Sequence, residues 1–232
     1  MPLLDLKSLR IPYRTELDRL YDCSIKSKHP FEQFKIWFEE ALAYPNLYEP
    51  NAMVLSTVSK CGRPSSRYVL LKGLDHRGFH FYTNSASKKG QDISHNPFVS
   101  LLFYWEPLKR QVRIDGKADL LPDAESVDYF NSRPKSSQVA AYVSDQSMPI
   151  KSDKQLLSDF ENAQRKFQND DTVPKPQSWV GYTVMPDRME FWQGQTNRLH
   201  DRLLFFRLDQ NEEVPEFAKA GEEGWYYERL AP

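Results

Sequence analysis

The segment from Glu190 to Arg202 concentrates side chains that could bind a planar anionic ligand. It reads Glu-Phe-Trp-Gln-Gly-Gln-Thr-Asn-Arg-Leu-His-Asp-Arg and runs into an apolar stretch. If a strand begins at this Arg-x-His-x-Arg pattern, Arg198, His200 and Arg202 project from one face, because successive strand residues point to opposite sides. Such a face, beside the indole of Trp192, suits a planar anion. The alternative is an ordinary solvated strand end.

The segment Ser65–Lys72 offers a second place for an anion. It reads Ser-Ser-Arg-Tyr-Val-Leu-Leu-Lys. With Val69 and Leu71 facing the core, Arg67 shares their inward parity, whereas Lys72 points the other way. A cation with inward parity in a small barrel needs a ligand phosphate or a carboxylate as its partner. An arginine at a barrel rim is the alternative.

Two further segments place cations near expected helix ends. Phe81–Gly90 gathers hydroxyl and amide residues before a pair of lysines, and a helix N-terminus presents free N–H groups to a phosphate. In Tyr129–Ser137, Tyr129 and Arg133 lie four residues apart, on one helix face. Both segments also have a plain structural interpretation, as an N-cap serine with solvated lysines and as a helix–proline–helix junction. Two phosphates in one cleft, one from a cofactor and one from a substrate, would account for all these candidates.

The composition and the motifs exclude several classes of function. With 31 Lys+Arg against 32 Asp+Glu the net charge is −1, so a general polyanion binder such as a nucleic-acid protein is not indicated. The sequence contains no Walker loop and no Gly-x-Gly-x-x-Gly. Neither Cys23 nor Cys61 has a Cys or His at metal-ligand spacing, so no metal site is expected. Anion sites with few acid–base candidates favour chemistry carried by a bound cofactor.

The hydrophobic pattern predicts a mainly β, α+β fold. Apolar residues at helical spacing predict a first helix over 30–44. Strands joined by hairpin-length links, typical of an antiparallel barrel, are predicted at 52–59, 67–72, 79–83, 98–105 and 111–121. Further helices are predicted at 87–95, 123–131, 136–143 and 152–168, the last opened by a capping box. Strands resume at 179–185, 189–192, 199–208 and 225–229.

We expect residues 1–28, which are polar and aperiodic, to form a mobile N-terminal arm, and residues 29–232 to form a single domain. No 18-residue apolar run is present, so no membrane span is expected. The N-terminus lacks the apolar segment of a secretory peptide, and two cysteines suit a reducing compartment. These features predict a cytoplasmic protein.

At these positions the sequence resembles the pyridoxine (pyridoxamine) 5′-phosphate oxidase family. The resemblance runs from about residue 30 to the C-terminus, and its most specific part is Trp-Gln-Gly-Gln-Thr-Asn-Arg-Leu-His-Asp-Arg at 192–202. Supporting segments are 67–72, 81–90, 101–112, 129–137, 146–147 and the closing Glu-Arg-Leu-Ala-Pro. The resemblance implies an FMN-binding split β-barrel of antiparallel Greek-key type with flanking helices, and a homodimer with FMN at the subunit interface. It also implies oxidation of pyridoxine or pyridoxamine 5′-phosphate to pyridoxal 5′-phosphate, with O2 as acceptor and H2O2 released, as in vitamin B6 salvage.

The resemblance also implies roles for individual residues. The FMN-binding set is Arg67, Tyr68, Val69, Leu70, Tyr82, Thr83, Lys88, Lys89, Gln111, Gln146, Ser147, Trp192 and Arg202. The substrate-binding set is Lys72, Tyr129, Arg133 and Ser137 for the phosphate, Arg198, Leu199 and His200 for the ring, and Arg10 and Tyr13 from an Arg-x-x-Tyr lid pattern. Arg198 and His200 are the catalytic candidates. The family often has arginine where Lys88 stands, and lysine lacks the bidentate fork, so weaker FMN affinity is expected.

Two other functions are compatible with such a fold. One is a flavin reductase or another FMN oxidoreductase that uses a nicotinamide. The other is a non-catalytic protein that binds pyridoxal phosphate or FMN. The set Lys72, Tyr129, Arg133 and Ser137 disfavours the first, because a second phosphate grip beside a flavin favours a small phosphorylated substrate.

Overall fold

The computed structural model describes residue 13, residue 20 and residues 25–232. Most of the predicted N-terminal arm, Arg10 included, lies outside the described residues. The chain divides into two compact units: a central unit of residues 51–101 and 115–186, and a C-terminal unit of residues 1–50, 102–114 and 187–232. The prediction of a single domain over 29–232 stays a prediction. No helix in the described part of the chain is long and apolar enough to cross a bilayer.

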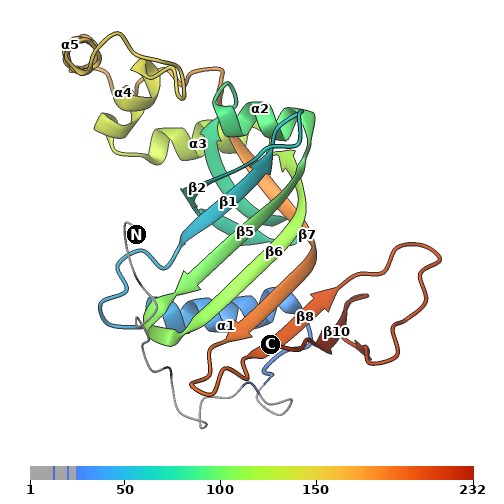
Figure 1. The fold of residues 1–232 in the computed structure, drawn as a ribbon. Helices are drawn as coiled ribbons and strands as arrows, with labels where there is room; N and C mark the ends of the chain where they lie inside the picture. The colour runs from blue at the N-terminus through green and yellow to red at the C-terminus, as the bar shows by residue number, and fades with distance from the viewer. Residues whose placement is uncertain (1–12, 14–19, 21–24) are drawn as a thin grey trace, which may run out of the picture. The chain divides into compact units, whose positions relative to one another are not determined.

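The central unit is built on a sheet, with α2 between β4 and β5 in the chain and three further helices between β6 and β7 (Figure 1). Its strands follow the order β2-β1-β5-β6-β7, and β4 pairs with β7 and β3 with β4. The strands are β1 (Ala52–Val58), β2 (Pro64–Leu70), β3 (Gly73–Asp75), β4 (Gly78–Asn84), and parts of β5 (Phe98–Trp105), β6 (Arg110–Leu120) and β7 (Trp179–Gln193). The helices are α2 (Lys88–His95), α3 (Asp123–Ser132), α4 (Lys135–Val143) and α5 (Asp153–Lys166). The neighbours β1–β5 and β4–β7 are not consecutive, as expected of a Greek key.

Alternating burial explains why β1 and β2 pair in a single register. Residues on β1 alternate between half-buried and buried, with Met53 and Leu55 fully inside. A one-residue slip would bring these side chains to the solvent, so burial fixes the register. In the antiparallel pair Leu55 stands opposite Arg67. The half-buried Arg67 therefore lies on the inner face, as its predicted parity requires.

Short polar contacts connect α3 to the turn between β3 and β4. The Arg77 guanidinium donates to Glu125 on α3 (Nη1–Oε1 2.6 Å) and to Asp75 (Nη2–Oδ2 2.7 Å). Thr183 of β7 donates to the carbonyl of Arg77 (2.8 Å). Burial by itself would raise the pKa of Asp75, but the hydrogen bonds from Arg77 outweigh it and hold that pKa at about 2. The first turn of α3 is thereby fixed, and this places Tyr129, one turn later.

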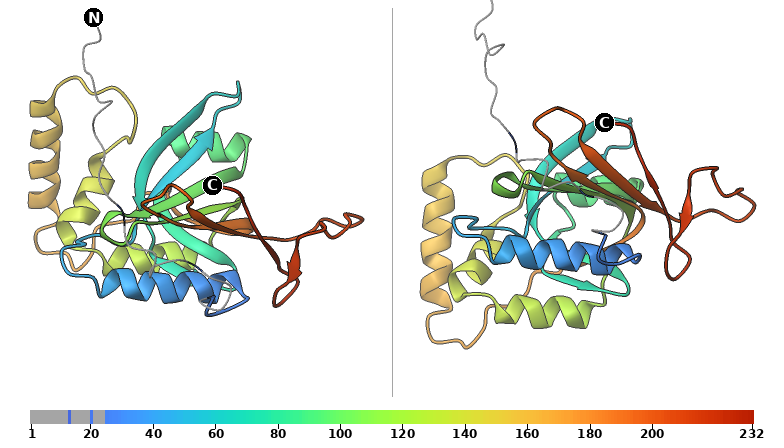
Figure 2. Two further views of the ribbon diagram at one scale, coloured as in Figure 1. Left: turned by 60° about the horizontal axis from the view of Figure 1, so that its bottom comes forward. Right: turned by 90° about the horizontal axis from the view of Figure 1, so that it is seen from below.

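Helices α4 and α5 pack on each other through a small apolar cluster, and Figure 2 shows them side by side in both views. The buried members of this apolar cluster are Val139, Ala163, Phe167 and Val173. The helix α5 begins where the capping box predicts, because the Ser152 hydroxyl accepts a hydrogen bond from the Gln155 amide (3.1 Å).

The C-terminal unit has an aromatic core under one helix. It contains α1 (Pro30–Leu42), the 3-10 turn Glu106–Leu108, the strands β8 (Asp201–Phe206), β9 (Lys219–Ala220) and β10 (Tyr226–Arg229), and the remaining parts of β5, β6 and β7. Its strands follow the order β5-β6-β7-β8-β10-β9. Phe34 of α1 packs on Phe103 (ring centroids 5.1 Å apart), and Trp37 meets Phe191 edge-on at 5.2 Å. The helical spacing of Phe31, Phe34, Phe38 and Leu42 predicts the helix, but of these residues only Phe34 lies on its buried face, which also contains Trp37 and Ala41, and Leu42 is exposed.

The predicted α+β, mainly antiparallel β fold is confirmed, with three corrections to its elements. The segments predicted as two strands, 179–185 and 189–192, form the single strand β7. Pro186 lies between the residues that pair with β4 (Trp179–Val184) and those that pair with β8 (Arg188–Gln193), so neither of these two strands meets its missing N–H. The strand predicted at 199–208 begins only at Asp201. The short strands β3 and β9 were not predicted, since two or three residues carry no periodic signal.

Candidate functional site

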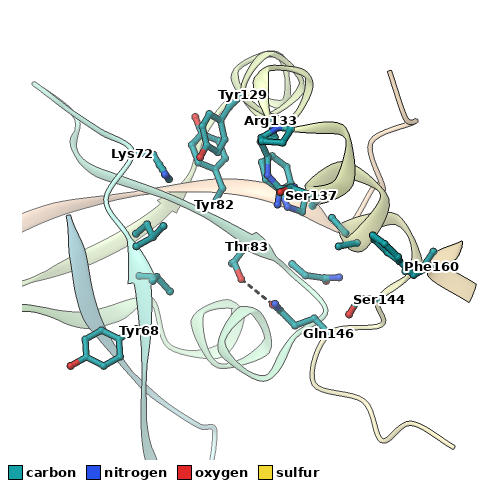
Figure 3. Close-up of a pocket in the computed structure, with 18 of the residues that line it drawn as sticks. Tyr68, Lys72, Tyr82, Thr83, Tyr129, Arg133, Ser137, Ser144, Gln146 and Phe160 are labelled. Atoms are coloured by element: carbon teal, nitrogen blue, oxygen red, sulfur yellow. Dashed lines mark hydrogen bonds between the residues drawn. The ribbon is translucent and has the colours of Figure 1, made fainter. Parts of the chain in front are cut away.

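The central unit contains a cavity of about 890 Å³ (Figure 3), a size typical of small-molecule sites. It is formed by β2, β4, the ends of α3 and α4, the loop after α4, and one face of α5. The predicted site residues that line it are Tyr68, Val69, Leu70, Lys72, Tyr82, Thr83, Tyr129, Arg133, Ser137 and Gln146. Predicted members of both the cofactor set and the substrate set therefore share one cavity.

One wall of the cavity is a stack of three aromatic rings. Tyr82 lies parallel to Tyr129 (centroids 4.2 Å apart, 27° between planes) and to Trp179 (5.3 Å, 11°). Gly181 stands opposite Tyr82 on β7, and a Cβ there would come within 2.7 Å of the Tyr82 ring. The missing side chain at Gly181 therefore lets Tyr82 lie against the sheet.

The Arg133 guanidinium is held against this wall. Its Cζ lies 5.1 Å from the centre of the Trp179 ring and 5.7 Å from that of Phe130. Its Nη1 is buried and has no hydrogen-bond partner among the described residues. Burial lowers the pKa of Arg133, which nevertheless stays charged. A buried guanidinium N–H without a partner is costly, so this group is suited to receive an anion.

Other polar groups of the substrate set approach the same place, as Figure 3 shows. The Lys72 ammonium lies 5.9 Å from the centre of the Tyr129 ring. Ser137 lies in the first turn of α4, whose free N–H groups and positive dipole end favour an anion. Buried Gln138 fixes the junction between α3 and α4, since its Nε2 donates to the carbonyl of Arg133 (2.9 Å). We call Lys72, Tyr129, Arg133 and Ser137 the first anion cluster.

A second anion cluster consists of Arg67, Lys88 and Lys89. Lys89 is only 9% exposed, and its Nζ donates to Gln146 Oε1 (2.9 Å) and Ser87 Oγ (3.2 Å). Burial, and then repulsion from Arg67, lower the pKa of Lys89 to about 8. Two cations that repel each other near the cavity residue Gln146 indicate a site for negative charge. Ser87 also caps α2, accepting from the Gly90 amide, so the cap and the cation cluster coincide.

Three predicted residues of the C-terminal unit contact a fourth, Tyr13. The ring of Tyr13 meets Trp192 edge-on at 6.2 Å and His200 at 5.8 Å, and the Arg198 Cζ lies 5.3 Å from its centre. His200 Nδ1 accepts a hydrogen bond from the Gln195 amide (3.0 Å). Burial, and then Arg198, lower the pKa of His200, so a neutral ring with its proton on Nε2 is favoured. Tyr13, Trp192, Arg198 and His200 form the Tyr13 cluster.

The predicted strand start at Arg-x-His-x-Arg is wrong. Arg198 has φ +67°, a left-handed conformation that a strand cannot contain. The preceding Asn197 explains the turn, because its Oδ1 accepts from the Leu199 amide (3.0 Å). Arg198 and His200 thus meet at Tyr13 through a loop and not through strand alternation. Leu199 is exposed.

Arg202 lies in β8 opposite Trp192 and is engaged with a buried carboxylate. Its Nε donates to Glu190 Oε1 (2.7 Å), and its Nη1 donates to the carbonyl of Ala231 (2.8 Å). Glu190 is 5% exposed and is also paired with Arg113 (3.1 Å). Glu190 was not predicted as a partner of Arg202, because no local pattern indicates that the two side chains meet across β7 and β8.

The remaining predicted residues are found outside these clusters. Gln111 is half-buried on β6, and Ser147 is exposed, with φ +74°, in the turn after α4. Arg10 lies outside the described residues. The cavity also has lining residues that were not predicted, among them Trp179, Leu156, Leu157 and Phe160. Their apolar side chains carry no chemical signal, so only the fold reveals them.

Comparisons with known proteins agree with this geometry. Residues 39–164 match the family model described as pyridoxamine 5′-phosphate oxidase, and residues 179–232 match the pyridoxine 5′-phosphate oxidase C-terminal dimerisation region. The chain is 47% identical over 231 residues to pyridoxine-5′-phosphate oxidase of Bos taurus, covering 99% of this chain and 88% of the relative. It is 46% identical over 228 residues to pyridoxine/pyridoxamine 5′-phosphate oxidase of Salinibacter ruber, covering 98% and 99%.

A solved structure is also similar over most of the chain. PhzG from Burkholderia lata, in complex with tetrahydrophenazine-1-carboxylic acid, superposes with a TM-score of 0.78 at 28% identity, covering 89% of this chain and 94% of that one. Together with the family models and the relatives at nearly half identity, this likeness leaves one assignment: the chain belongs to the pyridoxamine 5′-phosphate oxidase family.

Proposed function

We propose that this chain is an FMN-dependent oxidase that converts pyridoxine 5′-phosphate and pyridoxamine 5′-phosphate into pyridoxal 5′-phosphate. O2 is the acceptor and H2O2 is released; the amine substrate also consumes water and releases its nitrogen as ammonia. The observation that carries this proposal is the presence of two separate anion clusters: one lines the cavity around Arg133, and the other surrounds Lys89, whose Nζ bonds the cavity-lining Gln146. A phosphorylated cofactor and a phosphorylated substrate together need two such clusters.

The second anion cluster fits the phosphate of FMN. Lys89 is buried and already bonded to an amide and a hydroxyl oxygen, and Arg67 lies close enough to lower its pKa. Val69, Leu70, Tyr82 and Thr83 would hold the rest of the cofactor from β2 and β4. Bound FMN would supply the two-electron oxidation that this chain's own side chains cannot perform.

We propose that two groups of residues bind the substrate. Arg133, Tyr129, Ser137 and Lys72 would bind its phosphate, with the unpartnered Nη1 of Arg133 as the strongest donor. We propose that Arg198 and His200 cover the pyridine ring. The neutral His200 presents a proton on Nε2, so it can donate to a ring substituent or take part in moving a proton.

The C-terminal region matches a dimerisation region, so the protein is a homodimer. We propose that FMN is bound at the subunit interface, with Gln111, Ser147, Trp192 and Arg202 completing its pocket. We also propose a cytoplasmic location, which the exposed free thiol of Cys61 supports because such thiols persist in reducing compartments. Fractionation of cells that express the full chain tests that location.

A spectroscopic experiment tests the central proposal. The purified protein is expected to be yellow, to bleach anaerobically with pyridoxine 5′-phosphate, and to release one H2O2 per pyridoxal 5′-phosphate in air. Bleaching by a reduced nicotinamide cofactor, but not by pyridoxine 5′-phosphate, would support another FMN oxidoreductase. Flavin or pyridoxal phosphate binding without peroxide release would support a binding protein. Either outcome contradicts the oxidase.

Replacing Arg202 with tryptophan should weaken FMN retention. The change removes the donors to Glu190 and to the Ala231 carbonyl and adds bulk opposite Trp192. Losing a charge-assisted contact typically costs about 1.5–3 kcal/mol, so the Kd for FMN should rise by about tenfold or more. Flavin occupancy after dialysis measures the effect. Arg202→Lys keeps the charge, so its flavin occupancy should lie between that of the unmodified protein and that of Arg202→Trp. Unchanged occupancy in Arg202→Trp would remove Arg202 from the cofactor set.

FMN affinity should also fall as the pH rises above 8. The pKa of Lys89 is lowered to about 8 in the free protein, and the phosphate binds the protonated form. Affinity should therefore be full below pH 8 and decrease by up to about tenfold per unit above it. Titrations of the apoprotein between pH 7 and 9 measure this, since the phosphate stays dianionic there. Lys89→Met should bind FMN weakly, with an affinity that does not change between pH 7 and 9. A flat profile in the unmodified protein would contradict the assignment.

A further inference from the structure

One buried carboxylate holds the second anion cluster together. Asp92 on α2 is 4% exposed, and both its oxygens accept from Lys88 Nζ (2.6 and 2.7 Å). Its Oδ2 also accepts from the Thr57 hydroxyl (2.8 Å). The same hydroxyl oxygen accepts from Arg67 Nη1 (2.8 Å). Asp92 thus fixes Lys88 directly and Arg67 through Thr57, and it joins α2 to β1 and β2.

From this arrangement we propose that Asp92 is the positioning residue for the cofactor phosphate. The inference rests on the proposed function, because it takes the phosphate to be that of FMN. Arg67, Lys88 and Lys89 carry three positive charges, and Asp92 removes one, which leaves two. A phosphate monoester near neutral pH carries about two negative charges. The cluster with its carboxylate therefore balances the charge of the phosphate.

The geometry of these contacts decides the sign of the effect. Considered only as a charge, Asp92 repels the phosphate, so its removal would tighten FMN binding. Considered as a positioning group, it prevents the cations from turning to solvent or moving apart. Arg67 and Lys89 repel each other, and this repulsion, after burial, lowers the pKa of Lys89. Three short bonds to a buried carboxylate are a preorganised arrangement, and we expect preorganisation to outweigh the repulsion between Asp92 and the phosphate.

A comparison of two flavins separates this role from a general structural one. FMN and riboflavin differ only in the phosphate, so a defect confined to the cations should affect FMN alone. Flavin fluorescence during titration of the apoprotein gives both Kd values. For Asp92→Asn we expect a Kd for FMN raised by about tenfold or more, as for a lost charge-assisted contact. The Kd for riboflavin should change by less than about twofold.

Two further variants separate the direct contact of Asp92 with Lys88 from its connection to Arg67 through Thr57. Thr57→Val keeps the charge of Asp92 and its bond to Lys88 but cuts the connection to Arg67, so it should show a smaller, FMN-specific loss. Lys88→Met removes the other branch. If Asp92 acts through both cations, Asp92→Asn should cost less in the Lys88→Met background than in the unmodified protein. Should Asp92→Asn fail to fold, Thr57→Val alone decides the question.

Three outcomes would overturn the inference. Equal or tighter FMN binding by Asp92→Asn would show that the carboxylate acts only as a charge. An equal loss for FMN and riboflavin would show general damage to the fold. The third outcome has two parts: Asp92→Asn weakens FMN binding equally with and without Lys88, and Thr57→Val binds FMN normally. It would show that Asp92 acts through neither Lys88 nor Arg67. An unmodified apoprotein that binds neither flavin would instead refute the proposed function.

Discussion

Replacing Arg198 with alanine should remove most of the turnover of pyridoxamine 5′-phosphate while FMN stays bound. Arg198 belongs to neither anion cluster: it lies on the ring of Tyr13, beside His200, in a left-handed backbone conformation. A residue held in such a conformation at a site of this kind is a candidate for function. Losing one preorganised donor to the reacting ring typically costs about 100- to 1,000-fold in kcat. Steady-state peroxide release, together with the flavin spectrum, measures both parts of this expectation.

Two companion variants distinguish the side chain from the backbone. Arg198→Gly suits the φ of +67° and removes the guanidinium, so it should be as inactive as the alanine variant, although its backbone is less strained. Arg198→Lys keeps the charge without the planar fork and should recover only part of the activity. Turnover by Arg198→Ala close to that of the unmodified protein, with FMN bound, would exclude Arg198 from the mechanism.

Replacing Arg133 with methionine should abolish recognition of the substrate phosphate. The guanidinium is held by Trp179 and Phe130 and presents a buried Nη1 that has no partner among the described residues. A charge-assisted hydrogen bond contributes about 1.5–3 kcal/mol, so two bonds to a phosphate correspond to a loss of about 100-fold or more in kcat/KM. The loss should appear mainly in KM, because the contact is remote from the reacting carbon.

The unphosphorylated vitamer is the control for this variant. Pyridoxine lacks the group that Arg133 would bind, so Arg133→Met should change its slow turnover little. Arg165→Met is a matched exposed control in the same unit, since Arg165 is an exposed residue of α5 whose Nη2 bonds Asn162. If Arg133→Met kept a normal KM for pyridoxamine 5′-phosphate, the first anion cluster would not be the phosphate site.

Local sequence signals predicted the parts of the site that depend on local structure. Strand alternation places Arg67 on the inner face of β2, and the structure confirms that placement. The N-cap of α5 is the predicted Ser152, and the N-cap of α2 is Ser87, one of the two candidates Ser85 and Ser87. Spacing of four residues joins Tyr129 and Arg133, because both lie at one helix end. In each case neighbours within a few residues determine the geometry.

The parts that were missed depend on contacts between distant segments. Lys88 and Asp92 have the four-residue spacing of a helical ion pair, but the bond between Thr57 and Asp92 spans 35 positions. No local pattern therefore marks Asp92 as a group that is also connected to Arg67. Trp179 is the first residue of β7 and carries no charge that would mark it as a site residue, yet its ring supports the Arg133 guanidinium. The strand predicted through Arg198 failed because the side chain of Asn197 turns the backbone. A single asparagine side chain that bonds its neighbouring backbone, in competition with the hydrogen bonds of a strand, is harder to recognise in a sequence than an alternating pattern.

The change of partner within β7 has a consequence for local opening of the sheet. Residues 179–184 are bonded to β4, whereas residues 188–193 are bonded to β8, and Pro186 between them donates no bond. One half of the strand can open while the other half stays paired. Amide hydrogen exchange should therefore show two distinct protection levels along this single strand, with the step at the proline. Uniform protection would mean that both halves open together.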